Sequence, residues 1–548
     1  MRYRTAFPFA TSVEDVAVPL PDGVRLHARV WRPRTDVPVP ALLEFSPERL
    51  DDRTAARDAQ RHPWYAGHGY ASVRVDARGT GGSEGVYADH TAGDGAAVVG
   101  WLAGRAWCTG RVGMFGLGPG AQTALDVAAL APDPLAAVVA CAPGTASVPP
   151  LPPDPAGTGD WRALWRARLD APGPPAPADG GDVPVPVLAV AGWPDPAAGR
   201  VLDLLEASPT ARAIVGPWAR QYPDEAPAAA AIGFLQETLR WWEHWLRGAD
   251  TGVTDDPALR AFLGAGWAAE PVWPSPDVVL REAPLREGDA APVVVRSPPH
   301  AGVDTGRPVP RTAADLPHDQ REEDARGAAF DSAPLPAELT ILGRVRVRLR
   351  LAGEPGVLAL RLCDVGPDGA SALVARGEGE FPGAPGEWSD LTAVLRPTGH
   401  AFRPGHRVRL AVATARWPWS PDAPFTVTLD PARSVLALPV RTAEHAAPRP
   451  FDDPEHPPPL RVRLTGDRRP PLVVTRDVAA ATWRADTEDG SGGHRHLPGG
   501  LTYAESDRAT HLLGLDGART HTEYAFTLTR GDVTARLTVT DGVIEAAD

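Results

Sequence analysis

Short apolar runs alternate with amphipathic stretches over the first 142 residues. The segments VEDVAVPL and VRLHARVW flank the turn Pro21-Asp22-Gly23, a pattern that predicts a β-hairpin. After the hairpin, ALLEFSP, ASVRVDARG and RVGMFGLG have the pattern of buried strands, and residues 94–104 and 122–131 have a helical period. Strands that alternate with helices predict a parallel sheet with helices on both faces.

A Pro/Gly-rich stretch, residues 143–186, interrupts this alternation, and only DWRALWRARLDA within it has a helical pattern. The alternation then resumes with VPVLAVAGWPD and ARAIVGPWAR, and the helix GFLQETLRWWEHWLRG ends at Gly248. We expect Trp241, Trp242 and Trp245 of this helix to pack in a core. The pattern predicts one α/β domain, formed by 1–142 and 187–255, with 143–186 as an insertion.

The rest of the chain has strand alternation separated by Pro/Gly turns, as in LTILGRVRVRLRLAG, GVLALRLCDV and HRVRLAVATARW. We expect an all-β sandwich or jelly roll over 256–440 and a β-rich extension over 441–548.

Charge and cysteine content argue against several classes of partner and several kinds of site. The formal net charge of −14 argues against a nucleic-acid or anionic-membrane partner, because both need basic patches. Cys108, Cys141 and Cys363 lack paired spacing, so neither a disulfide framework nor a zinc site is indicated, and we expect no metal. The first residues lack the apolar core of a signal peptide, and no run of about 18 apolar residues occurs. We expect a cytoplasmic protein.

Residues 110–121, GRVGMFGLGPGA, read as a strand that enters a Gly-rich turn and then a helix. In α/β-hydrolases this arrangement is the nucleophile elbow G-x-S-x-G, and here its middle position is Gly118. The same letters loosely fit a dinucleotide fingerprint, but the next strand, AAVVACAPG, does not end in the acidic residue that such a site needs. We expect no cofactor.

The chain resembles the CocE/NonD hydrolases, the family of cocaine esterase and X-Pro dipeptidyl-peptidases. The resemblance spans roughly 13–440 and implies an α/β-hydrolase domain, a reduced cap at 143–186 and a C-terminal jelly-roll domain. The stretches that carry it are GHGYASVRVDARGTGGSEG (67–85), WLAGRAWCTGRVGMFG (101–116), VPVLAVAGWPDP (185–196), IVGPWA (214–219), GFLQETLRWWEHWLRGADTGV (233–253), DQREEDARGAAFDSAPL (319–335), RLCDVGPDGAS (361–371) and FRPGHRVRLAVATARWPWSP (402–421).

The resemblance also implies which residues stand at the catalytic positions. The nucleophile position falls on Gly118, the base position on Arg220, and the acid position on Asp195, which keeps its carboxylate. The two oxyanion-hole positions fall on Pro119, which has no N–H, and on Glu48. Arginine stays protonated at working pH, so Arg220 cannot accept a proton, and we expect it to form an ion pair with Asp195.

Four other side chains in this domain could in principle replace the nucleophile: Ser46, Ser83, Ser147 and Cys108. No histidine falls near a triad position to activate them, so we interpret the serines as ordinary turn residues. A new acid–base site built from Glu48, Asp195, Arg220 and Asp224 is a further alternative.

The leading interpretation is a catalytically impaired homologue that binds a small molecule, a peptide or a protein partner. Two alternatives stay open. One is an enzyme with acid–base, cyclisation or isomerisation chemistry in the same pocket, and the other is residual ester or X-Pro peptide hydrolysis.

Overall fold

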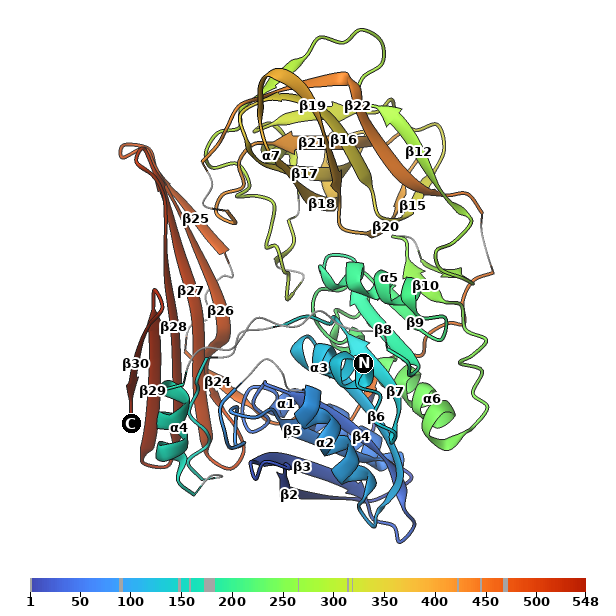
Figure 1. Cartoon of the computed structure of the whole chain (residues 1–548), viewed down its shortest axis with the longest axis vertical. Coiled ribbons are helices and arrows are strands. Elements are labelled where there is room, and N and C mark those ends of the chain that lie inside the picture. The colour runs from blue at the N-terminus through green and yellow to red at the C-terminus, as the bar shows by residue number, and fades with distance from the viewer. Residues whose placement is uncertain are drawn as a thin grey trace.

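The computed structural model describes residues 2–87, 92–145, 149–156, 159–171, 183–264, 266–312, 315–317, 319–420, 423–443, 446–466 and 472–548. Figure 1 shows three bodies along the chain: an α/β domain in blue to green, a β-sandwich in yellow to orange, and a curved C-terminal sheet in red. None of the helices in the described ranges is long and apolar enough to span a membrane.

The α/β domain is built on one sheet of ten strands in the order β11-β10-β9-β8-β7-β6-β4-β5-β3-β2. Strands β4 to β10 pair in parallel, and β2, β3 and β11 add antiparallel edges. The predicted hairpin at the start of the chain is therefore present as β2 and β3. The strands are β2 (Thr11–Pro19), β3 (Arg25–Pro33), β4 (Val39–Ser46), β5 (Ala71–Asp76), β6 (Cys108–Leu117), β7 (Leu135–Cys141), β8 (Val187–Gly192), β9 (Arg212–Gly216), β10 (Leu259–Phe262) and β11 (Trp267–Glu270).

Helices cover both faces of this sheet, as the alternating pattern predicts. Helices α2 (Ala92–Ala103), α3 (Pro119–Ala129) and α5 (Ala197–Ala207) pack on one face. Helices α1 (Ala55–Gly67) and α6 (Phe234–Arg247) pack on the other, where Trp241 and Trp242 are buried. Helix α6 ends at Gly248, which adopts the left-handed conformation that glycine accepts without penalty.

The boundary between the first two domains lies further along the chain than the sequence indicates. Strand β10 pairs with β9 and with β11, so residues 259–270 extend the α/β sheet. We predicted that the β-sandwich begins at residue 256, and the pairing corrects this. Strands of four residues carry too short an alternation to be assigned to one sheet or another.

Two packed sheets form the β-sandwich, with a continuous apolar core between them. One sheet has the order β19-β16-β22-β15-β20, with β12 and β13 also paired to β22, and the other has the order β14-β21-β17-β18. The strands are β12 (Val278–Pro284), β13 (Val293–Val295), β14 (Ala328–Asp331), β15 (Leu339–Gly343), β16 (Arg346–Gly353), β17 (Gly356–Val365), β18 (Ser371–Phe381), β19 (Ala384–Val394), β20 (Thr398–Phe402), β21 (Arg407–Ala413) and β22 (Val427–Arg441), with the short helix α7 (Arg321–Asp324).

The C-terminal extension is an antiparallel sheet of long strands that lies beside the α/β domain (Figure 1). Its strands are β24 (Arg463–Thr465), β25 (Leu472–Asp477), β26 (Thr482–His496), β27 (Leu501–Gly514), β28 (Gly517–Arg530), β29 (Val533–Thr540) and β30 (Val543–Ala547). Two short strands, β1 (Arg2–Tyr3) and β23 (Glu455–His456), pair with each other outside this sheet.

The described residues of the reduced insertion include the helix α4 (Trp161–Leu169), where the sequence predicts it. The Asp160 carboxylate caps it by accepting a hydrogen bond from the Ala163 N–H at 3.1 Å. Its buried Trp161 and Trp165 pack with Tyr503 and Phe526 of the C-terminal sheet. The helix is therefore one of the contacts between the insertion and the extension, and Arg53 of the α/β domain also pairs with Glu505.

Candidate functional site

The turn between β6 and α3 has the backbone of a nucleophile elbow. Gly118 has φ 57° and ψ −116°, a conformation that residues with a Cβ adopt only under strain. Its N–H donates to the Cys141 carbonyl at 2.9 Å, and its own carbonyl accepts from the Gly144 N–H at 3.3 Å. A Cβ built on Gly118 would meet no atom within 4 Å. The turn lies where the sequence predicts it, and it leaves room for the side chain that glycine lacks.

A second glycine allows helix α3 to approach the strand. A Cβ on Gly116 would lie 2.4 Å from the Gly120 carbonyl carbon, which no real side chain tolerates. Pro119 occupies the first turn of α3, where its fixed φ suits the helix and its missing N–H costs no intrahelical bond. The elbow is thus compatible with proline, but the backbone N–H that would face an oxyanion there does not exist.

Asp195 and Arg220 lie on the loops after β8 and β9, at the carboxyl edge of the sheet. The Arg220 Nε and Nη2 atoms donate to the two Asp195 carboxylate oxygens at 2.8 and 3.0 Å, a bidentate pair. The Asp195 side chain is fully buried and also accepts from the Ala197 N–H at 2.8 Å. The ion pair predicted from the sequence is confirmed.

Arg220 lies beside the elbow. A Cβ built on Gly144 would be 3.5 Å from the Arg220 Nη2 atom, and the Gly144 N–H is the group that donates to Gly118. The Arg220 backbone N–H donates to the Pro310 carbonyl at 3.0 Å, so the segment between β13 and β14 of the β-sandwich fixes this loop. A permanent cation therefore stands next to the position where a nucleophile would need a base.

Glu48 pairs with arginines other than Arg220. Its carboxylate lies 3.2 Å from Arg57 Nη1 and 3.6 Å from Arg53 Nε. These three residues line a cavity of about 190 Å³ that Tyr503 and Glu505 of the C-terminal sheet close on the other side. None of five cavities formed by described residues has both Glu48 and Asp195 in its lining, and none is lined by Gly118.

Three other residues that the sequence suggests as acid, base or nucleophile are buried, and Asp224 and Ser83 already bind other groups. The Asp224 carboxylate binds Arg61 at 3.1 Å, with both side chains buried. Ser83 is buried; its Oγ accepts from the His27 backbone N–H at 2.9 Å and donates to the Asp76 carbonyl at 2.7 Å. Burial raises the pKa of the Cys108 thiol, which makes its thiolate scarcer.

Two serines complete this set. The Ser46 Oγ accepts from the Glu48 N–H at 3.3 Å, and the Ser46 side chain is buried. Ser147 lies outside the described residues. None of the candidate nucleophiles in the described ranges therefore contacts a histidine ring.

Sequence reasoning missed a Ser–His–Glu arrangement inside the domain. The Ser72 Oγ lies 2.7 Å from His62 Nδ1, and His62 Nε2 lies 3.2 Å from the Glu44 carboxylate. The three residues come from β5, α1 and β4, so no sequence motif joins them. All three are at most 1% exposed, and Trp31 stacks on the imidazole with ring centroids 4.6 Å apart. The contacts of a catalytic triad are present, but no substrate can reach them.

Charge compensation explains this buried network. Burial alone would raise the pKa of Glu44, but Arg57 and His62 outweigh it and hold that pKa well below its usual value. Glu44, Asp58 and His62 lie close enough to share a metal ion. Arg57 already contacts both carboxylates, at 2.9 and 3.4 Å, so the group is better described as an ion cluster.

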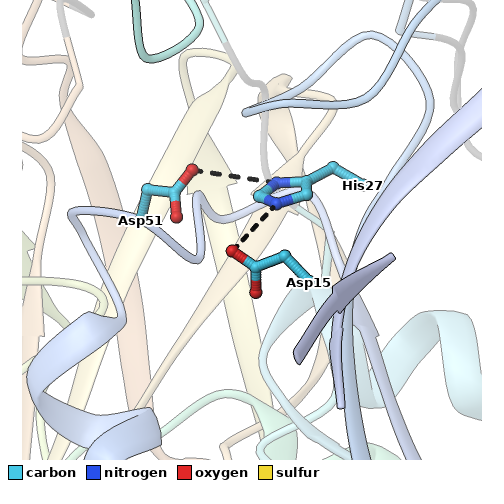
Figure 2. Close-up of side chains that lie close together, drawn as sticks. All are labelled: Asp15, His27 and Asp51. Carbon is cyan, nitrogen blue, oxygen red and sulfur yellow. Dashed lines mark ion pairs between the residues drawn. The ribbon is translucent and has the colours of Figure 1, made fainter. Parts of the chain in front are cut away.

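A second group with metal-ligand geometry lies beside the first hairpin, where Asp15 of β2 and Asp51 of the segment after β4 flank His27 of β3 (Figure 2). His27 Nε2 is 3.8 Å from Asp15, and Nδ1 is 3.7 Å from both Asp51 and Asp76. Arg29 already binds Asp15 at 2.7 Å and Asp51 at 3.0 Å, so a cation would compete with a guanidinium. The β2–β3 register, which pairs Asp15 with Arg29 and Ala17 with His27, is the signal that could have indicated this cluster.

The imidazole and the carboxylates of this cluster shift one another's pKa values. Burial would lower the pKa of His27, but the carboxylates of Asp15 and Asp76 raise it to about 10. Burial raises the pKa of Asp51 to about 6, despite the opposing effect of His27. The cluster is held together by a protonated imidazole rather than by a neutral ligand.

Two family descriptions match this chain. Residues 22–149 match the X-Pro dipeptidyl-peptidase (S15 family), and residues 251–447 match the X-Pro dipeptidyl-peptidase C-terminal non-catalytic domain. The first range includes Glu48 and the elbow, and the second covers most of the β-sandwich. Both ranges end before the C-terminal sheet.

Individual relatives agree with these matches. Cocaine esterase of Rhodococcus sp. (strain MB1 Bresler) is 26% identical over 534 residues, covering 74% of this chain and 91% of that protein. A CocE/NonD family hydrolase from Staphylococcus aureus superposes with a TM-score of 0.59 at 15% identity, covering 78% of this chain and 93% of its own. An aminopeptidase from the marine sediment archaeon Thaumarchaeota archaeon superposes with a TM-score of 0.61 at 17% identity, covering 79% and 96%. At these identities the two superpositions show a shared fold.

Proposed function

We propose that this chain, which belongs to the CocE/NonD hydrolase family, is a catalytically impaired member that acts by binding or scaffolding rather than by serine hydrolysis. The observation that carries the proposal is the bidentate Asp195–Arg220 pair beside a side-chain-free Gly118. Acyl transfer by a serine hydrolase needs a nucleophile whose proton a neutral base can take. Both groups are replaced here.

The loss extends to the stabilisation of charge in the transition state. Each oxyanion-hole donor contributes roughly 3–4 kcal/mol to catalysis. Pro119 offers no N–H, and Glu48 places a carboxylate, bound by Arg57, where the family resemblance expects a hydroxyl donor. A serine introduced elsewhere in the site would therefore gain little from its surroundings.

Two contacts argue against new acid–base chemistry in the same pocket. Such chemistry would need Glu48 and Asp195 to face one concave site, so that one carboxylate stays protonated. Glu48 instead binds arginines of the α1 region, and Asp195 binds Arg220 with both oxygens. These contacts favour a vestigial site whose ion pair maintains the loops.

Hydrolysis assays test the proposal. The purified protein should turn over neither p-nitrophenyl acetate nor an X-Pro anilide above the buffer rate, and a fluorophosphonate probe should label no serine. Gly118→Ser alone should remain inactive, because Arg220 cannot take the proton and Pro119 donates nothing. The matched control is the triple variant Gly118→Ser, Pro119→Tyr, Arg220→His, which should show measurable esterase activity if the elbow geometry suffices. Stoichiometric labelling of the unmodified protein would overturn the proposal.

A further inference from the structure

A cavity of about 290 Å³ lies where the α/β domain meets the β-sandwich. The loops after β8 and β9 supply Trp193 and Pro217, β10 supplies Phe262, and strands β18 and β20 supply further walls, including Val374. The lining is mostly hydrocarbon and aromatic ring. Its size is at the lower end of the range for small-molecule sites, which also tend to lie at domain interfaces.

Two arginines give this apolar cavity a polar end. Arg376 and Arg396 line it, and none of the carboxylates in the described residues lies within 4.0 Å of either guanidinium. Arg376 donates to the backbone carbonyls of Thr305 and Gly306 at 3.1 and 3.3 Å, and Arg396 donates to the Pro308 carbonyl at 2.6 Å. These carbonyls are dipoles, so they position the arginines without cancelling their charges.

The neighbouring acids are already neutralised. Glu378 binds Arg416 at 2.5 Å, and Asp195 binds Arg220. Glu378 acts on Arg376 and Arg396 only at longer range, so neither arginine has a carboxylate in close contact among the described residues. Burial, together with the charges of Arg396 and Arg416, lowers the pKa of Arg376 to about 9. Unpaired charges are costly to bury, so a bound anion would relieve the site.

We propose that this cavity binds a small organic carboxylate, with its anionic group on Arg376 and Arg396 and its apolar body against Trp193, Phe262 and Val374. Planar guanidinium groups match carboxylates geometrically, and the remaining walls offer burial to carbon rather than to water. Neither Gly118 nor Arg220 lines the cavity, so the site is separate from the vacated catalytic position and does not depend on the loss of hydrolysis.

Isothermal titration with three probes tests this site on the full chain. The probes are 4-phenylbutyrate, its neutral counterpart 4-phenylbutanol, and inorganic phosphate. The carboxylate should bind at least tenfold more tightly than the alcohol and than phosphate, because only it uses both the charged and the apolar parts. Arg396→Gln, which keeps a donor for the Pro308 carbonyl but removes the charge, should weaken 4-phenylbutyrate binding by at least tenfold. The matched control Arg433→Gln changes an exposed arginine of the same domain and should have no effect.

A second variant, Val374→Phe, keeps the proposal testable if Arg396→Gln fails to fold. Val374→Phe fills the cavity and keeps both arginines, so it should abolish 4-phenylbutyrate binding. The proposal is overturned if the carboxylate and the alcohol bind equally, if phosphate binds as tightly as the carboxylate, or if both variants bind like the unmodified protein. Esterase activity would refute the impaired-enzyme proposal and leave this one standing, so the two can fail separately.

Discussion

The vacated site at the sheet edge and the buried Ser72–His62–Glu44 network each contain what the other lacks. At the sheet edge the elbow turn, Asp195 and open space at Gly118 are present, and we propose that the nucleophile and the base are lost. In the buried network a hydroxyl, an imidazole and a carboxylate touch in sequence, yet Trp31 and the sheet seal them. The contacts of a triad therefore occur in the buried network, whereas the open turn that a triad would need lies at the sheet edge.

The difference lies in access and in the charge that surrounds each group. A catalytic histidine must change its protonation state while substrate is bound, which needs a cavity and donors for the developing oxyanion. His62 has neither, and Arg57 keeps Glu44 permanently paired. At the sheet edge the elbow turn and Asp195 are present, and we propose that Arg220 stands with a fixed charge where a titratable ring would act. A hydrogen-bonded triad pattern alone is therefore a poor indicator of hydrolysis.

Removing the charge of Arg220 at the sheet edge should lower the free energy of unfolding more than any change in the buried network, in the His27 cluster or at the elbow. Arg220→Leu leaves the fully buried Asp195 carboxylate with only the Ala197 N–H, and breaking a buried ion pair in this way costs about 3–5 kcal/mol. The urea midpoint of the α/β domain should fall accordingly. The double variant Asp195→Asn, Arg220→Leu should recover most of the loss, because it removes the unpaired charge. An unchanged midpoint in the single variant would show that the pair has no architectural role.

The buried network should respond less strongly to the loss of its histidine. His62→Leu removes two hydrogen bonds but leaves Glu44 compensated by Arg57, so we expect a loss of about 2–3 kcal/mol. The matched control His521→Leu changes a half-exposed histidine and should change the free energy of unfolding by less than about 0.5 kcal/mol. No change in ester turnover should accompany either variant. Any turnover that His62→Leu removes would mean that the network is reached by substrate.

Much of the sheet-edge site could be predicted from the sequence because its parts lie on strand ends that local patterns reveal. The run RVGMFGLG fixes the end of β6 and places Gly118, and the GPWAR stretch after β9 places Arg220. The family resemblance assigns Asp195 and Arg220 to neighbouring catalytic positions, and since the carboxyl ends of parallel strands share one edge, the two residues are expected to lie close together.

The buried network and the cap contact could not be predicted in this way. Ser72, His62 and Glu44 each look like ordinary positions of a strand or helix, and only their three-dimensional packing brings them together. Trp161 and Trp165 indicate an amphipathic helix, but nothing local shows that its partner is a sheet more than 300 residues further along the chain. Non-local contacts of this kind leave no periodic signal in the sequence.

A pH titration separates a histidine-based ion cluster from the arginine-based one. The pKa of His27 is raised to about 10 from its ordinary 6.5, so its stabilising effect is complete below about pH 6.5 and disappears as the pH rises through 10. His27→Gln should cost on the order of 2 kcal/mol at pH 6 and progressively less toward pH 10. The deficit of Arg220→Leu should not shrink over the same range, because arginine keeps its proton. Urea midpoints measured at pH 6 and pH 10 test both expectations. A stability deficit of His27→Gln that grows with pH would contradict the raised pKa of His27.

The smallest effect is expected at the elbow itself, where conformation and chemistry can be separated. Gly118→Ala places a Cβ on a residue with φ 57°, which costs about 1–2 kcal/mol, although the Cβ meets no atom within 4 Å. Gly118→Ser should cost the same, because nothing surrounds the hydroxyl that could bind it strongly. The matched control Gly100→Ala lies in helix α2 with equally open space, and it should stabilise the protein by up to about 1 kcal/mol, since alanine favours helix. Urea denaturation of the three variants measures these differences. If Gly118→Ser proves clearly more stable than Gly118→Ala, the hydroxyl has found a partner beside Arg220, and the vacated site retains more of its original chemistry than the ion pair indicates.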